Sequence, residues 1–256
     1  MQAIRHAIEM WQTKIISMSF GSEEMSCEIR DAIEEARQRN VILLAAAGNS
    51  GNRRDIPYPA NEDGVFKIFA ANSSGYTADF SPPTGDHDRH HSYFTFGCGV
   101  VSTWPSSLRE KAEGEEPKVF CYDYKDGHKH SEDGCDIRTV MSGTSFATPI
   151  AAALVAIIYQ FYDANESLES RVRLRDGSKG RFKSRKAVRA ILTMMSRTSL
   201  QAPYNFLEPA RGKDNYFYFQ QERLRPGKAS PLNIAGQTPI QFFSKKLSEA
   251  LYVANV

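Results

Sequence analysis

The stretch Met141–Ala153, with the sequence MSGTSFATPIAAA, decides the fold, because it leads from a Gly-Thr turn into an apolar helix. The hydroxyl of Ser145 falls in the first turn of this predicted helix. Backbone N–H groups there have no partner in the helix, and the dipole is positive at that end, so an oxyanion beside Ser145 would be stabilised. We expect Pro149 to be tolerated, since the early N–H groups have no bond to lose. A serine here can also be an ordinary helix cap.

A second apolar run, Val41–Gly51 with the sequence VILLAAAGNSG, predicts a buried strand that ends in small residues and an amide. The small side chains of Ala46, Ala47 and Gly48 let a backbone approach closely, so this edge can form the wall of a pocket. The side chain of Asn49 can donate a hydrogen bond to a carbonyl oxygen that gains charge. Taken alone, the Gly-Asn pair also fits an ordinary turn after a strand.

A third segment, Lys14–Ser22 with the sequence KIISMSFGS, predicts another short strand that ends in small and polar residues. Taken in order, the motifs ISMSFG, AAAGNSG and SGTSFATP resemble those of the subtilisin family of serine peptidases. Residues 65–73, 78–81 and 97–105 resemble the connecting segments of that family. The resemblance covers roughly residues 1 to 220, so it reaches most of the chain.

The resemblance implies a site and a substrate. Ser145 would be the nucleophile, and the oxyanion hole would consist of the Asn49 side chain and the Ser145 N–H group. A polypeptide substrate would pair as an added strand and place the residue before the scissile bond in a pocket between two strand edges. The implied substrate-binding residues are Ser19, Phe20, Gly21, Ala46, Ala47 and Gly48. No cofactor and no metal are expected.

The acid and the base of the family's triad are missing from this sequence. The family carries an aspartate in an Asp-Ser/Thr-Gly motif and a histidine in a His-Gly motif, both before the first of these strands, and neither motif occurs here. His6 precedes the strand, but a solvated or packing role explains it better. We therefore expect the C-terminal part of a catalytic domain, nearly inert alone, with both residues upstream. The alternative is an inactive, subtilisin-like module that binds peptides or regulates, so whether the chain is an enzyme stays open.

The expected fold is α/β, with three layers, a mostly parallel sheet and helices on both faces, from which the first strands are missing. An open sheet edge of this kind predicts poor solubility or association. The apolar spacing of Ile4, Ile8 and Trp11 predicts one buried helical face. The predicted elements are helices at 1–12, 150–161 and 184–199, and a final strand at 215–220.

Residues 1–222 are expected to form this partial domain, with an insertion at about 106–139 and a tail of unknown role at 223–256. The insertion contains Cys121, His128, His130 and Cys135, which are all competent zinc ligands. Their spacing matches no common zinc motif, so a polar surface loop, with or without a disulfide, is favoured over a metal site.

Composition narrows the partners. With 32 basic and 30 acidic residues the net charge is +2, which favours neither nucleic acid nor an anionic membrane. The basic stretch at 171–189 is interpreted as a solvated loop, with nucleic acid or phosphate binding as the alternative. No apolar run is long enough to span a bilayer. The four cysteines are sparse for a secreted scaffold, which favours an intracellular setting, and further domains of a longer chain are additional expected partners.

Overall fold

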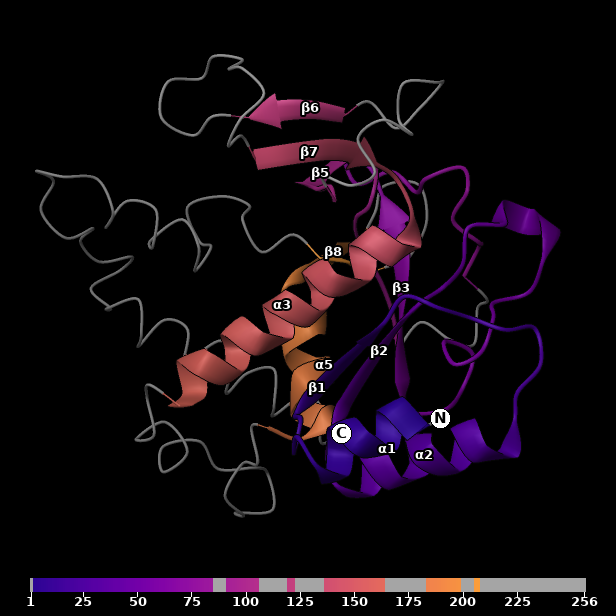
Figure 1. Ribbon diagram of the computed structural model, residues 1–256, viewed down its shortest axis with the longest axis vertical. Helices are drawn as coiled ribbons and strands as arrows, with labels where there is room; N and C mark the ends of the chain where they lie inside the picture. Colours follow the sequence, from indigo (N-terminus) through magenta and orange to yellow (C-terminus); the bar gives the residue numbers. More distant parts are fainter. Residues whose placement is uncertain are drawn as a thin grey trace, which may run out of the picture.

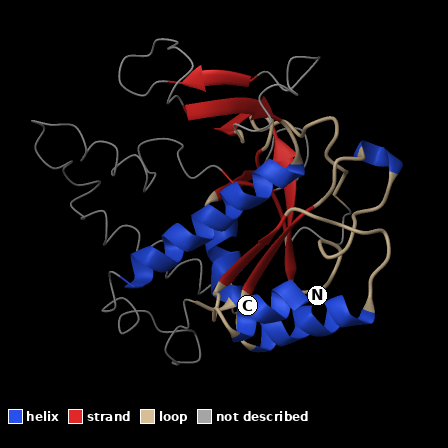
Figure 2. Cartoon of the chain, in the orientation of Figure 1, coloured by secondary structure: helices blue, strands red, loops and turns tan. Residues whose placement is uncertain are grey.

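A parallel β-sheet lies between helices in the computed structural model, which describes residues 2–84, 91–105, 119–122, 136–163, 183–198 and 205–207 (Figures 1 and 2). The sheet has six strands in the order β1-β2-β3-β4-β9-β8. The first five of these run parallel, and β8 pairs antiparallel with β9. In chain order the strands are β1 (Ile15–Met18), β2 (Ile42–Ala46), β3 (Val65–Ala71), β4 (Ser92–Phe96), β8 (Ser196–Thr198) and β9 (Asn205–Leu207).

Helices pack on both faces of this sheet. One face is covered by α3 and α5, and the other by α1 and α2, which lie side by side (Figure 1). The bounds are α1 (Gln2–Glu9), α2 (Cys27–Gln38), α3 (Thr144–Asp163) and α5 (Arg185–Met194), and a short 3-10 helix, η1 (Gly51–Arg53), follows β2. The predicted α/β class with a mostly parallel sheet is therefore confirmed.

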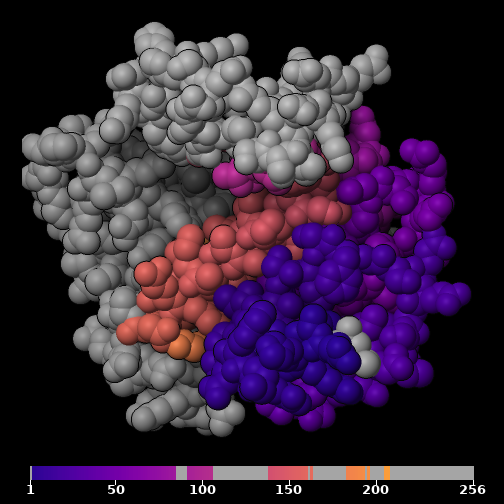
Figure 3. Space-filling model, in the orientation of Figure 1, coloured from indigo at the N-terminus to yellow at the C-terminus, as the bar shows by residue number. Residues whose placement is uncertain are grey.

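Strand β2 shows why the layers form. All five of its residues are buried, as its unbroken apolar run predicts for a strand covered on both faces. Successive side chains point to opposite faces, so Ile42 and Leu44 join the cluster under α3 and α5. Leu43 and Ala45 join the cluster under α1 and α2. This strand thus contributes apolar side chains to the core on each face of the sheet, and Figure 3 shows α3, in salmon, running across the surface of the molecule.

The end of β4 fixes the start of α3. Gly97 accepts a 2.8 Å hydrogen bond from the Gly143 N–H group. A Cβ atom on Gly97 would lie 2.7 Å from the Cβ of Ala70 and 3.1 Å from the carbonyl oxygen of Gly143. Only glycine allows such close contact, so this residue places the first turn of α3 against the sheet.

A second, three-stranded antiparallel sheet leads into α3. Its order is β5-β7-β6, with β5 (Val100–Thr103), β6 (Val119–Tyr122) and β7 (Asp136–Met141). The expectation of a surface loop is therefore wrong for parts of the segment 106–139. The short run VFCY, rich in aromatic and β-branched residues, has strand propensity that its charged surroundings obscured.

Several helix bounds differ from the sequence predictions. The first helix ends at Glu9, so Trp11 lies beyond it and is 72% exposed instead of joining the buried Ile4 and Ile8. The apolar helix begins at Thr144, so Ser145 lies in its first turn as predicted, and it runs through the apolar stretch at 150–161 to Asp163. The predicted helix at 184–199 starts as expected, with Ser184 as its N-cap, but it gives way to β8 because β-branched and hydroxyl residues end it.

Some predicted features fall outside the described residues. These are the strand at 215–220, the tail at 223–256, most of the basic stretch at 171–189 and three of the four zinc candidates, His128, His130 and Cys135. Within the described part of the chain no group of side chains could hold a metal ion. No helix in that part has the length and apolar character needed to cross a membrane.

Candidate active site

The first turn of α3 meets the ends of two parallel strands. Met18 pairs with Ala45, so the carboxyl ends of β1 and β2 lie at the same edge of the sheet. The residues that follow these strands therefore form two neighbouring walls, and α3 begins beside both. The half-buried Ser145 lies at this junction as the second residue of the helix. Its place in the first turn is the one predicted from the sequence.

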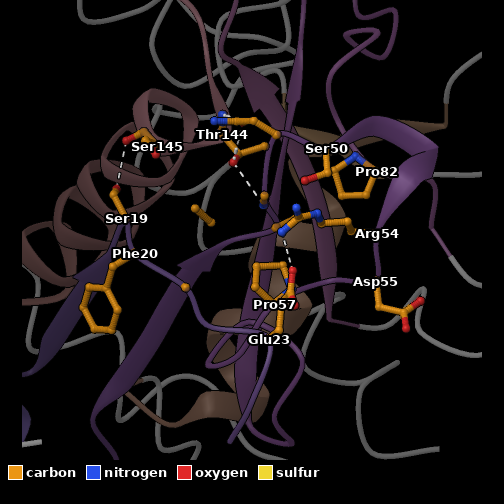
Figure 4. A pocket seen from close by; sticks show the side chains of 15 residues that line it. Ser19, Phe20, Glu23, Ser50, Arg54, Asp55, Pro57, Pro82, Thr144 and Ser145 are labelled. Atoms are coloured by element: carbon orange, nitrogen blue, oxygen red, sulfur yellow. Dashed lines mark hydrogen bonds and ion pairs between the residues drawn. The ribbon is translucent and has the colours of Figure 1, made fainter.

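A pocket of about 280 Å³ opens between these walls (Figure 4). All eight predicted site residues line it, so the structure brings together every one of them. The predicted residues are Ser19, Phe20, Gly21, Ala46, Ala47, Gly48, Asn49 and Ser145. The lining also contains residues that the sequence did not single out for this pocket, namely Glu23, Ser50, Arg54, Asp55, Pro57, Pro82 and Thr144.

The amide of Asn49 is oriented by its neighbour in the first turn of α3. Its Oδ1 atom accepts hydrogen bonds from the Thr144 N–H group at 2.8 Å and from the Thr144 hydroxyl at 3.0 Å. That hydroxyl accepts a further bond of 3.2 Å from the Gly48 N–H group. With Oδ1 engaged twice, the amide nitrogen Nδ2 is turned away from Thr144, and no described acceptor is bonded to it.

Two glycines make this arrangement possible. Gly48 has φ of +98°, a conformation that favours glycine, and it turns the chain from β2 toward Asn49. A Cβ atom on Gly143 would lie 3.3 Å from the Nδ2 atom of Asn49, so the amide lies directly over the backbone before α3. The Ser145 N–H group is in the same turn and has no bonded acceptor among the described residues. The site therefore offers two hydrogen-bond donors, Nδ2 and the Ser145 N–H.

The carbonyl oxygen of Ser145 is bonded from outside the helix. Pro149 is four residues further on and has no N–H group, so it cannot make the usual helical bond to this carbonyl. The Ser19 hydroxyl donates to it instead at 2.9 Å (Figure 4). Pro149 is thus the sixth residue of α3 and does remove a helical hydrogen bond, contrary to the prediction that it had none to lose.

Charged side chains form the open side of the pocket. The Arg54 guanidinium, from the segment after β2, pairs with the Glu23 carboxylate, from the segment after β1 (Figure 4). Both side chains are well exposed, so water weakens the attraction between them. Asp55 adds a second carboxylate to the lining. This side of the pocket is consequently polar, whereas the walls from Ala46 to Gly48 are not.

Neither histidine in the described part of the chain accompanies Ser145. His6 stacks edge-on against Trp11, with ring centroids 5.1 Å apart. His91 lies against Phe66, with centroids 5.8 Å apart. No described side chain is bonded to the Ser145 hydroxyl. Cys98 offers no rival nucleophile, because burial, followed by the nearby Asp79, raises the pKa of its thiol.

The pocket residues that the sequence analysis did not identify differ in how much the sequence could have indicated their role. Thr144 stands inside the motif that drew attention to Ser145, but its hydroxyl faces a partner 95 positions away, which no local pattern reveals. Arg54 and Pro57 lie in a segment without periodicity, so their place in the pocket follows from the tertiary structure alone.

Comparison with known proteins agrees with the family resemblance seen in the sequence, and it does so over most of the chain. The family described as the Subtilase family matches residues 1–203. The minor extracellular protease Epr of Bacillus subtilis is 30% identical over 161 residues, which are 63% of this chain and 20% of that protein. Subtilisin DY of Bacillus licheniformis is 28% identical over 179 residues, covering 67% of this chain and 53% of the relative. The chain thus spans from a fifth to about half of the lengths of these relatives.

Solved structures with low identity share the fold. The self-cleaved protease domain of PatA aligns with a TM-score of 0.56 at 22% identity, and the alignment covers 81% of this chain and 63% of that one. The PatG macrocyclase in complex with peptide aligns with a TM-score of 0.57 at 18% identity and covers 81% and 52%. At these identities the similarity is one of fold alone.

Proposed function

We propose, because this chain belongs to the subtilase family, that its pocket is the nucleophile half of a serine endopeptidase site acting on polypeptides. Ser145 is the nucleophile, and its hydroxyl oxygen attacks the scissile carbonyl carbon to give an acyl-enzyme. The position of Ser145 in the first turn of α3 supports this role, because the helix N-terminus favours negative charge beside it.

The orientation of the Asn49 amide is the observation that carries the proposal. An oxyanion hole needs donors fixed in place before the charge develops. The two bonds from Thr144 to Oδ1 hold the amide with Nδ2 free to donate. Together with the Ser145 N–H group it supplies two donors to one developing oxyanion. Asn49 is exposed, so this donor can be reached by a ligand that enters the pocket.

The substrate is proposed to bind as an extended strand beside the segment from Ser19 to Gly21. This segment continues β1, the end strand of the described sheet, and it is exposed. Pairing through the main chain gives affinity without regard to side chains, whereas the pocket reads one side chain. Binding there would place the scissile carbonyl near Ser145 and Asn49.

A base must take the proton from the Ser145 hydroxyl during attack and return it to the leaving amine. We propose that a histidine and its carboxylate partner from outside the described residues do this, since His6 and His91 are packed elsewhere. The absence of a described base also favours a second candidate, a module that binds peptides without cleaving them. The endopeptidase site and the peptide-binding module differ in how reactive the Ser145 hydroxyl is.

Labelling with a fluorophosphonate probe separates the two candidates. The full-length protein that contains this chain, its S145A variant and its S142A control are treated with the probe across pH 5 to 9, and the modified residue is identified by mass spectrometry. Ser142 is an exposed serine three positions earlier, and its oxygen accepts a bond from the Gly99 N–H. An endopeptidase site labels at Ser145 in the chain and in S142A but not in S145A, with a rate that rises through an inflection near pH 7.

Slow labelling without that inflection, together with saturable peptide binding, would support the binding module instead. Labelling that persists unchanged in S145A would contradict both roles for Ser145. Where Ser145 does react, N49A is expected to slow it by about 10²–10³-fold, which is the effect of removing one oxyanion-hole donor from a subtilisin.

A further inference from the structure

The pocket is closed between its two walls by the ring of Pro57. A Cβ atom placed on Gly21 would lie 2.8 Å from both the Cβ and the Cγ of Pro57. One placed on Gly48 would lie 3.1 Å from its Cδ and 3.4 Å from its Cγ. The ring therefore lies against the backbone of both walls and takes up part of the space between them.

Hydrogen bonds hold this ring in place. The Ser22 N–H donates to the Tyr58 carbonyl at 2.8 Å, and the Tyr58 N–H donates to the Ser22 carbonyl at 2.8 Å. The carbonyl of Pro57 itself accepts a 3.0 Å bond from the Asn61 N–H. Proline also has a fixed φ, so the residue has little freedom to move aside. A bulky side chain would have to break these bonds to displace the ring.

The part of the pocket that the Pro57 ring does not occupy is lined by charged side chains. Past Pro57 the pocket is lined by Glu23, Arg54 and Asp55, with the Arg54–Glu23 pair beside the ring (Figure 4). A large apolar side chain that turned in this direction would cover charged groups and remove water from them, which is costly. A leucine or phenylalanine side chain would therefore meet either the Pro57 ring or these charged groups.

We propose that Pro57 determines specificity by restricting the residue before the scissile bond to glycine, alanine or serine. This inference rests on the proposed function, since it assumes that a peptide binds along Ser19 to Gly21. In this proposal the two walls, at Gly21 and Gly48, receive the main chain of this residue, and a side chain that extends between them meets the Pro57 ring. Pro57 acts by its bulk and takes no part in the chemistry.

The test is equilibrium binding of short peptides to the ¹⁵N-labelled chain, followed by NMR. The probes are acetyl-Ala-Ala-Pro-Xaa-amides in which Xaa is glycine, alanine, serine, leucine or phenylalanine, titrated into the chain and into its P57G and P57A variants. The matched control is P83G, which makes the same change at an exposed proline outside this pocket. Circular dichroism and thermal melting of each variant establish that it is folded.

We expect the small residues to bind at least three-fold more tightly than leucine or phenylalanine in the parent chain and in P83G, with shifts centred on Gly21 and Gly48. P57G is expected to bind the phenylalanine peptide several-fold more tightly than the parent does, and P57A to lie between the two. Equal or tighter binding of the large residues to the parent chain would overturn the role of Pro57 while leaving the peptide site intact. Absence of binding by every peptide would overturn the proposed function and this inference with it.

Discussion

The Ser19 hydroxyl donates a hydrogen bond of 2.9 Å to the carbonyl oxygen of Ser145, across 126 positions of sequence. The bond exists because Pro149 leaves that carbonyl without its helical donor. It joins the segment proposed to bind substrate to the turn that carries the proposed nucleophile. A shift of either one is therefore transmitted to the other.

Removing this hydroxyl is expected to loosen the start of α3. S19A should lower the free energy of unfolding by about 0.5–1 kcal/mol, because the bond is exposed and water replaces part of it. Chemical denaturation measures this loss, and hydrogen exchange at the first turn of α3 should quicken. The control S17A changes an exposed serine on β1, the strand that leads to Ser19. A control as destabilised as S19A would show that the bond contributes nothing of its own.

The Thr144 hydroxyl is expected to set the orientation of the Asn49 amide. T144V removes one of the two donors to Oδ1 and leaves the Gly48 N–H without its acceptor, which should cost about 1–3 kcal/mol of stability. The Asn49 side-chain amide signals in the NMR spectrum should broaden or move. T144S keeps the hydroxyl and should restore them.

The control for this change is T148V, one turn further along the helix. Thr148 is fully buried and donates to the Thr144 carbonyl at 2.8 Å, so it is a buried, hydrogen-bonded threonine of the same helix that lacks the bonds of Thr144 to Asn49 and Gly48. T148V should lose stability while the Asn49 signals stay in place. If both variants disturbed those signals equally, the orientation would come from packing of the helix and not from the Thr144 hydroxyl.

The close approach at Gly97 is expected to tolerate no side chain. In G97A the new Cβ would lie 2.7 Å from the Cβ of Ala70 on β3 and 3.2 Å from the Cβ of Ala147 on α3, so the strands or the start of α3 must shift, at a cost of about 1–3 kcal/mol. Thermal unfolding of G97A, A70G and the double variant measures this contact. A70G should cost less in the G97A background than alone, because it gives the new methyl group room. If the losses of stability in the two single variants simply added up in the double variant, the new methyl group of G97A would not be in contact with Ala70.

How far the sequence predicts this protein depends on how local each feature is. The unbroken run of β2 and the first turn of α3 follow from composition and spacing, which is why Ser145 and Asn49 could be placed correctly. Contacts between segments far apart in the sequence could not be predicted from composition and spacing. The bond from Ser19 to Ser145 depends on a missing N–H at Pro149, and the pocket role of Pro57 depends on two glycines in other segments. Trp11 was misplaced because the helix ends two residues before it, where the sequence has no glycine to mark the boundary.

Lys67 is expected to make stability depend on pH in the alkaline range. It lies on β3 and is only 5% exposed, and burial lowers the pKa of its ammonium group from 10.5, although the charge of Asp63 acts in the opposite direction. Below the lowered pKa the folded protein carries a buried charge, which opposes folding. Between that pKa and 10.5 the unfolded chain binds more protons than the folded one, so stability attributable to this group rises with pH.

K67M removes the buried charge and keeps much of the side-chain volume. We expect it to unfold at a higher temperature than the parent at pH 7, and the difference to shrink as pH rises from the lowered pKa toward 10.5. Thermal melts of both proteins at a series of pH values measure the difference, in which the other titrating groups cancel. The control K14M alters an exposed lysine just before β1 and should change neither quantity. A loss of stability in K67M that stays constant with pH would mean that the Lys67 ammonium is stabilised in place by its surroundings.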